Sequence, residues 1–193
     1  MSGKAELQEP YDPLNYQNLA RNVVRALMDQ PYEPLPPSRS FSGVGVYALY
    51  YTGALDYYQS VGNEDTPIYV GSAVPAGKRK GAKAIVETGH ALYSRLMHHA
   101  KSITQTRNLS LSDFRCRYLV VVPVWIGLAE RFLIEHYQPI WNTMVDGFGN
   151  HDPGSGRKNM KRPRWDILHP GRSWAKKLKA IESPDDIINK LKR

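Results

Sequence analysis

Apolar residues at helical spacing mark the first element that the chain predicts. They recur through residues 13–28 at i, i+4, i+5, i+8 and i+9, which places them on one face of an amphipathic helix. These positions are Leu19, Val23, Val24, Leu27 and Met28. The next stretch, residues 31–43, contains four prolines and therefore predicts an extended arm.

Three runs of β-branched and aromatic residues predict strands. The first is GVYALYY at 45–51, the second is PIYVG at 67–71, and the third is FRCRYLVVVPVW at 114–125. The third run is the most continuously apolar, so we expect it near the centre of a sheet.

Two helices are expected around the third strand. ALYSRLMHHAKSI at 91–103 precedes it, and GLAERFLIEHYQP at 127–139 follows it and ends at a proline. The order of elements predicts a small α+β domain, in which a mixed or antiparallel three-stranded sheet is flanked by helices.

The C-terminal quarter of the chain predicts a loop and a short helix. Residues 142–164 are rich in glycine, proline and asparagine, and a loop of this length is more often functional than idle. Residues 183–193 begin with Ser183 and Asp186 at the spacing of a capping box, which predicts a final helix.

Positive charge is concentrated at the C-terminal end. The whole chain carries a net charge of +8, while residues 1–70 hold 4 Lys and Arg against 8 Asp and Glu. Residues 157–193 hold 12 Lys and Arg against 4 acids. Such an excess favours a polyanionic partner, because cations placed on phosphates release condensed counterions. A solvated basic tail is the alternative, and charge alone does not separate nucleic acid from an anionic membrane surface.

Several classes of protein are disfavoured by the sequence. No apolar run reaches the roughly 20 residues that a membrane-spanning helix needs. The N-terminus lacks the charged and apolar pattern of a secretory signal, so we expect a cytoplasmic protein without a membrane partner. The single cysteine, Cys116, excludes an internal disulfide and a cysteine-rich zinc module.

Five short motifs follow one another along the chain. They are Gly45-Val46-Tyr47, Tyr69-Val70-Gly71, Arg95 with His99, Glu130 in Glu-Arg-Phe-Leu-Ile, and Asn142 at the end of Pro-Ile-Trp-Asn. Arg95 and His99 lie one helical turn apart and so share a face. Each motif alone has an ordinary structural interpretation, as strand packing, a solvated helix face or a helix cap. Their order makes the functional interpretation the stronger one.

This ordered set resembles the signature of the GIY-YIG nuclease family over residues 43–143. The flanks are similar to those of the type II restriction endonuclease of this family that cuts CCGCGG, in the GVYALYY strand and the GFGNHDPG segment. The family often has a lysine after its second motif, whereas this chain has Ser72-Ala73. We therefore expect basic contacts from the insertion at 75–91. Its candidate residues are Lys78, Arg79, Lys80 and Lys83.

The resemblance implies a catalytic set of Tyr47, Tyr69, Arg95, His99, Glu130 and Asn142. By family position, Glu130 would hold Mg²⁺ or Mn²⁺, which one carboxylate and several waters can bind. Arg95 offers a fork of donors to a phosphate oxygen. A tyrosine with a pKa of about 10 is almost wholly protonated at pH 7, so Tyr47 needs a relay to act as base. His99 is the expected relay, with His98 as the alternative, and Tyr69 would orient the water.

The basic loop and tail are the expected DNA-reading region. Their glycines allow the backbone to approach a groove, and Phe148 would supply an apolar contact there. The candidate DNA-binding residues are Asn150, His151, Arg157, Lys161 and Lys177.

The chain is expected to divide into three parts within one structural domain. These are an N-terminal helix and arm at 1–42, a GIY-YIG-like core at 43–143, and a basic extension at 144–193. The implied function is hydrolysis of double-stranded DNA at a palindromic and GC-rich site, CCGCGG by resemblance. A palindrome calls for a homodimer, for which the N-terminal helix and the arm at 31–40 are the candidate contacts.

Two other functions remain open from the sequence. A nicking, homing or repair nuclease of the same family is disfavoured, because such proteins usually add separate DNA-binding modules. A non-catalytic DNA-binding module is disfavoured because Tyr47, Arg95 and Glu130 are all present.

Overall fold

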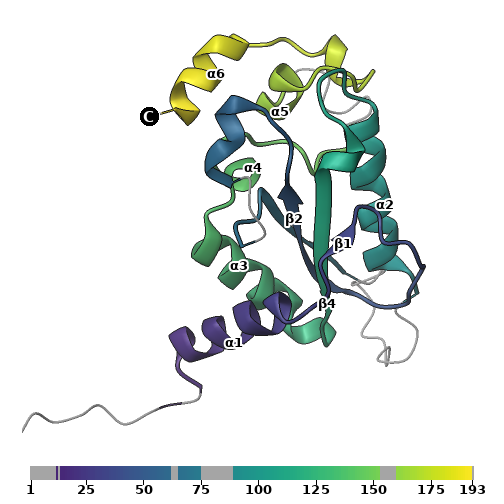
Figure 1. Cartoon of the computed structure of the whole chain (residues 1–193), viewed down its shortest axis with the longest axis vertical. Helices are drawn as coiled ribbons and strands as arrows, with labels where there is room; N and C mark the ends of the chain where they lie inside the picture. Colours follow the sequence, from purple (N-terminus) through teal and green to yellow (C-terminus); the bar gives the residue numbers. More distant parts are fainter. Residues whose placement is uncertain (1–11, 13, 62–64, 75–88, 153–159, 193) are drawn as a thin grey trace, which may run out of the picture.

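An antiparallel sheet lies at the centre of the molecule (Figure 1). The computed structural model describes residue 12 and residues 14–61, 65–74, 89–152 and 160–192. The sheet has four strands in the order β1-β4-β2-β3. Their bounds are Glu33–Pro34 for β1, Gly45–Tyr51 for β2, Tyr69–Ala73 for β3 and Phe114–Val120 for β4.

The sheet has one strand more than the sequence predicts. The extra strand is β1, which comes from the proline-rich arm and pairs with β4 through Glu33 and Pro34. Proline cannot donate a ladder hydrogen bond and is tolerated at a sheet edge, which is where β1 lies. The buried Leu35 follows directly. This part of the arm therefore packs on the core.

Strand β2 is buried along its whole length. Successive side chains of a strand point to opposite faces, so the strand divides between two hydrophobic clusters. Tyr47 and Leu49 belong to one cluster, and Val46 and Ala48 belong to the other. Burial on both faces explains why this strand is an unbroken apolar run instead of an alternating one.

Helices cover both faces of the sheet (Figure 1). Helix α2, Ala91–Thr104, contributes Leu92 and Leu96 to the cluster that contains Tyr47. Helix α1, Tyr16–Met28, and helix α3, Ile126–Tyr137, share the opposite cluster with Val46. The three helices predicted before residue 140 are thus present, with bounds shifted by a few residues. In the described part of the chain, no helix is both long and apolar enough to cross a bilayer.

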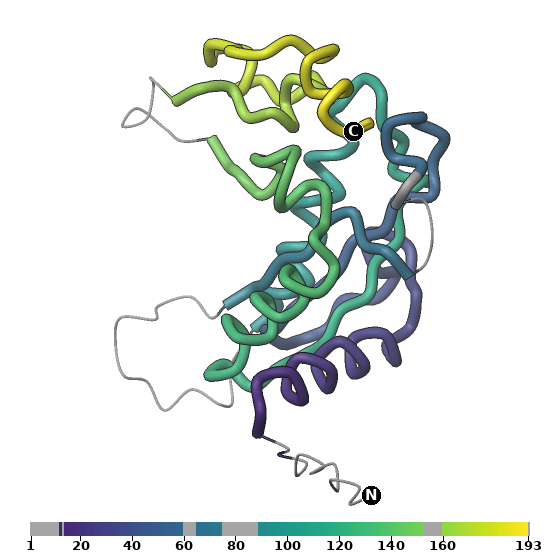
Figure 2. Tube along the Cα trace, turned by 90° about the vertical axis from the view of Figure 1, so that its left-hand side faces the viewer, coloured from purple at the N-terminus to yellow at the C-terminus, as the bar shows by residue number. Residues whose placement is uncertain are grey.

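The C-terminal segment packs on the end of the core away from α1 (Figure 2). Two short helices, α4 at Ile140–Thr143 and α5 at Arg164–Leu168, lie at the two ends of the region predicted as loop. The last helix, α6, spans Pro184–Leu191, and Ser183 and Asp186 form the predicted capping box. Trp165 joins the same cluster as Tyr47. The basic extension therefore packs into the same hydrophobic core as the face of the sheet that carries Tyr47.

A buried hydrogen-bonded chain ties the C-terminal segment to the core. The Trp141 indole donates to the Tyr58 hydroxyl at 2.8 Å, and that hydroxyl lies 2.7 Å from Nε2 of His169. His169 Nδ1 lies 3.2 Å from Oδ1 of Asn108. Burial lowers the pKa of His169 to about 3, so the imidazole is neutral. Tyr58 then donates to Nε2, and Nδ1–H donates to Asn108.

This neutral histidine predicts a pH dependence of stability. The folded pKa lies below the unfolded value of about 6.5, so the unfolded chain binds more protons between these values. The free energy of unfolding therefore falls as pH drops through this range. In His169→Gln, which keeps an acceptor, we expect the slope between about pH 6 and pH 5 to be smaller by up to roughly 1.4 kcal/mol per pH unit. Urea unfolding of both proteins measures it, and equal slopes would contradict the assignment.

Candidate active site

The two tyrosine motifs form one packed unit across β2 and β3. The antiparallel register places Tyr47 opposite Gly71. A Cβ atom at Gly71 would lie 2.3 Å from the Tyr47 hydroxyl and 3.1 Å from the Tyr69 ring. Real Cβ atoms do not approach so closely, so the glycine of the second motif leaves room for the tyrosine of the first.

The Tyr47 hydroxyl lies 2.5 Å from Nε2 of His99 on α2. Both side chains are buried, with 0% and 2% of their surface exposed. His98, the alternative relay, is exposed and meets the His151 ring edge-on at 5.7 Å. The geometry therefore favours His99 as the partner of Tyr47.

Burial fixes the protonation states of this pair. It raises the pKa of the Tyr47 phenol well above 10.0, an effect that Tyr69 reinforces and Arg95 opposes. Burial also lowers the pKa of His99 well below 6.5, and the Arg95 charge adds to that shift. The resting pair is therefore a neutral phenol and a neutral imidazole, which can share one proton.

Arg95 lies beside both phenols. Its charge lowers the pKa values of Tyr47 and Tyr69, against the larger effect of burial. Its Nη2 donates to the Gly149 carbonyl at 3.1 Å, and its Nη1 lies 2.6 Å from Nε2 of His151. A Cβ atom at Gly149 would lie 2.7 Å from the Tyr69 hydroxyl, so this glycine too allows a close approach.

The loop that carries Gly149 closes over the site. Phe148 stacks on His99 with ring centroids 4.5 Å apart and meets Tyr69 edge-on at 5.0 Å. It is only 1% exposed. The expectation that Phe148 contacts a DNA groove is therefore wrong, because its ring is part of the wall that buries His99.

Glu130 lies within α3, about one turn from its start. Its carboxylate accepts a hydrogen bond from the Ser72 hydroxyl at 2.8 Å, and its charge raises the pKa values of Tyr47 and Tyr69. Ser72, the residue directly after the second motif, therefore holds the Glu130 carboxylate, a contact that the sequence did not suggest. A half-buried single carboxylate suits a hard cation that keeps most of its waters.

Asn142 bonds to the backbone of β3. Its Oδ1 accepts from the Val70 amide and its Nδ2 donates to the Val70 carbonyl, each at 2.8 Å. Strand β3 is an edge of the sheet, so this amide substitutes for a neighbouring strand between Tyr69 and Gly71. The contact positions the second motif.

No sequence pattern pointed to Arg172, a buried residue that holds the loop over the site. It forms an ion pair with Asp166 and donates to the carbonyls of Gly147, Phe148 and Asn150 at 2.9 to 3.0 Å. An arginine of a basic tail is indistinguishable in sequence from one that contacts solvent or DNA.

Residues 39–192 match the family described as the Eco29kI GIY-YIG domain. The chain belongs to this family. It is a family of restriction endonuclease domains, so the chain is an endonuclease domain whose partner is DNA. Comparison with curated proteins gives no match.

GIY-YIG nucleases are generally metal-dependent. Among the described residues there is no cluster of three or more His, Cys, Asp or Glu side chains that could enclose a metal ion. In this Eco29kI-type domain, Glu130 would be the protein ligand of a cation, and water and DNA would supply the other ligands.

Eight of the nine DNA-binding residues expected for this domain divide into two groups, and the ninth, His151, contacts Arg95. Lys78, Arg79, Lys80, Lys83 and Arg157 lie outside the described residues. Asn150 and Lys161 line a cavity of about 490 Å³ at the C-terminal end, and Lys177 is exposed in a 3₁₀ turn at Ala175–Lys177. Asn150 and Lys161 thus come together, although eleven positions separate them in the sequence.

The packing of Gly71 predicts the effect of one methyl group. In Gly71→Ala, the Tyr47 hydroxyl must move away from its place beside His99, and we expect DNA cleavage to fall by about 10- to 100-fold. The matched control is Gly127→Ala in α3, where a Cβ atom meets nothing within 4 Å. Cleavage rates and circular dichroism of both variants test this. A folded Gly71→Ala protein with full activity would refute the steric argument.

Proposed function

We propose that this domain is a type II restriction endonuclease that hydrolyses both strands of a palindromic DNA site with Mg²⁺ or Mn²⁺. The proposed catalytic residues are Tyr47, Tyr69, Arg95, His99 and Glu130, with Asn142 as a positioning residue. The observation that carries the proposal is the buried 2.5 Å contact of Tyr47 with His99, beside the Arg95 guanidinium.

The proton relay accounts for Tyr47 as a base. As the water oxygen bonds to phosphorus, Tyr47 takes the proton of the water and passes its own proton to Nε2 of His99. The P–O bond to the leaving oxygen breaks, and that oxygen takes a proton from solvent. No free phenolate forms, which matters because burial opposes it.

The charge of the substrate makes this transfer easier. The product of the relay is a buried imidazolium, which Arg95 disfavours in the free protein. A bound phosphate places negative charge beside both groups and so favours the charged form of His99. Proton transfer is thereby coupled to DNA binding.

Arg95 and Glu130 supply the charges of the site. Among the described residues, Arg95 forms no ion pair with a carboxylate, so its full positive charge is available to a phosphate oxygen. Glu130, held by Ser72, is the proposed ligand of the divalent cation. When bound, that cation would stabilise negative charge on the phosphate and the leaving oxygen. Tyr69 would orient the attacking water beside Tyr47.

Sequence recognition is assigned to the loop and tail around Asn150 and Lys161. Asn150 would contact base edges, while Lys161 and Lys177 would contact phosphates. The lysines at 78, 80 and 83 and the arginines at 79 and 157 are proposed from sequence alone. Membership of the Eco29kI family supports CCGCGG as the target.

Glu130→Gln tests the catalytic proposal. The amide keeps the size of the side chain but loses the charge that holds the cation, so we expect plasmid cleavage in magnesium to fall below detection. Binding to a cognate duplex should stay within about threefold of the original protein. A variant that cuts at a near-normal rate would refute the metal assignment. In the unaltered protein, nicked or merely retarded plasmid would instead favour a nicking enzyme or a non-catalytic module.

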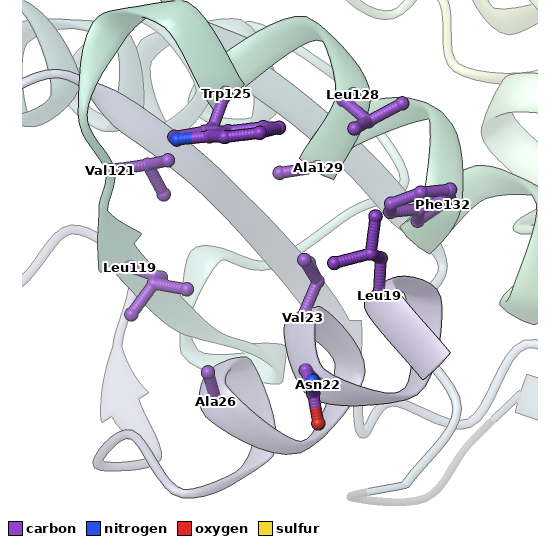
Figure 3. Close-up of a pocket in the computed structure, with 10 residues that line it drawn as sticks. All are labelled: Leu19, Asn22, Val23, Ala26, Leu119, Val121, Trp125, Leu128, Ala129 and Phe132. Carbon is purple, nitrogen blue, oxygen red and sulfur yellow. The ribbon is translucent and has the colours of Figure 1, made fainter. Parts of the chain in front are cut away.

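A homodimer is proposed because each chain supplies one catalytic site and a palindrome has two strands to cut. An apolar groove of about 250 Å³ runs between α1 and α3, with Leu19 and Val23 on one side and Phe132 on the other (Figure 3). Trp125, which is 53% exposed, lies at the same groove, and the adjacent Val124 is 77% exposed. We propose that a second copy covers this surface.

Val124→Glu tests the dimer surface without touching the core. We expect the association constant of the protein to fall at least about tenfold, because a charge would be buried in an apolar interface. Ile181→Glu, at a site that is 54% exposed and remote from the groove, is the matched control. Sedimentation equilibrium over a range of concentrations measures both. Unchanged association of Val124→Glu would contradict this surface.

A further inference from the structure

The guanidinium of Arg95 is anchored by uncharged groups. His151 Nε2 lies 2.6 Å from Nη1, and the Gly149 carbonyl accepts from Nη2 at 3.1 Å. The two phenols that interact with it, Tyr47 and Tyr69, are also neutral. Each described partner therefore fixes the orientation of the fork without cancelling its charge.

This choice of partners suits a phosphate-binding arginine. A carboxylate would hold the side chain more firmly, but it would also repel a phosphate and reduce the net charge that the phosphate meets. An unanchored arginine would have to lose side-chain entropy when the substrate binds. A neutral imidazole avoids both costs, since it accepts one hydrogen bond and carries no charge.

The role depends on the charge state of His151. Since the guanidinium can only donate, the imidazole must accept through an unprotonated Nε2. Partial burial lowers the pKa of His151, as do Arg95 and His98 from α2 and Arg172 from the C-terminal segment. These groups all keep the imidazole neutral. Protonation would replace the hydrogen bond by repulsion.

We propose that His151 is a positioning residue for Arg95, which holds the guanidinium in its phosphate-binding orientation through a neutral Nε2 acceptor. This inference rests on the proposed function. It differs from the expectation that His151 contacts DNA, because it assigns the imidazole to the protein side of the site. The structure supports it through the contact with Arg95 and through the loop that Arg172 fixes.

Two substitutions separate these roles. His151→Gln places a neutral amide oxygen near the position of Nε2, whereas His151→Leu removes the acceptor at similar size. Single-turnover cleavage of a cognate duplex in magnesium should fall about 10- to 100-fold in the leucine variant and recover to within about threefold in the glutamine variant. The dissociation constant, measured with calcium in place of magnesium, should change less than threefold in both. His136→Leu, an exposed histidine on α3, is the control for loss of a surface imidazole.

The pH profile adds a readout that a purely structural role would not move. At about pH 8 the original protein and His151→Gln should cut at similar rates. Below about pH 6 the original protein should lose rate relative to the glutamine variant, because only its acceptor can be protonated. Both proteins retain His98 and His99, so the ratio of their rates isolates residue 151.

Each alternative gives a distinct result. If both variants bind the duplex more weakly by a similar factor, His151 is a DNA contact and the inference is wrong. If both lose cleavage equally at pH 8, an acceptor is not what the site needs, and the inference is again wrong. If the original protein cuts the cognate duplex and His151→Leu cuts it at the same rate, the inference fails and the proposed function stands. If the original protein does not cut any duplex in magnesium, the proposed function itself fails.

Discussion

The buried ion pair of Arg172 and Asp166 supports the loop at 147–151, which forms one wall of the site. Arg172 is 2% exposed and Asp166 is 3% exposed, so both charges need complete compensation. Asp166 accepts two of the guanidinium hydrogen bonds, three loop carbonyls accept the others, and Trp165 and Trp174 lie 4.5 and 4.7 Å from the guanidinium carbon. Removing one member of such a pair typically costs about 3–5 kcal/mol.

The loop that Arg172 holds places the Phe148 ring on His99. The same loop places the Gly149 carbonyl and the His151 imidazole against the Arg95 guanidinium.

The cations of the basic extension therefore have two different uses. Arg164 is paired with Glu182, which also holds Lys190, and Arg162 donates to the carbonyls of Ala175 and Lys176. These bonds, like those of Arg172, hold the C-terminal segment together. Lys161 and Lys177 are exposed and take part in no ion pair among the described residues. A count of lysines and arginines thus overstates how many side chains of the extension are free to contact DNA, because several of them hold the C-terminal segment together.

Local patterns predicted the elements well, and long-range packing accounts for most of what they missed. The strand at 45–51 follows from its run of β-branched and aromatic residues, and the helix that carries Arg95 and His99 follows from its local sequence. Both signals depend only on neighbours in sequence. Strand β1 escaped prediction because Glu33 and Pro34 belong to a proline-rich segment and acquire strand structure only by pairing with β4. The role of Phe148 escaped for a related reason. In a glycine-rich segment an aromatic residue has no periodic context, and its burial is decided by Arg172, 24 positions later.

The two tyrosine motifs are better understood as a steric arrangement than as two separate signatures. Each phenol lies against a glycine that another segment supplies, since Gly71 faces the Tyr47 hydroxyl and Gly149 faces that of Tyr69. The absence of side chains at these glycines lets two phenols, an imidazole and a guanidinium meet in a volume from which water is largely excluded. That exclusion keeps Tyr47 and His99 neutral in the resting site, so the imidazole is able to accept the proton that the proposed relay would pass to it. The glycines therefore contribute to the chemistry through the packing that sets the protonation state of the site.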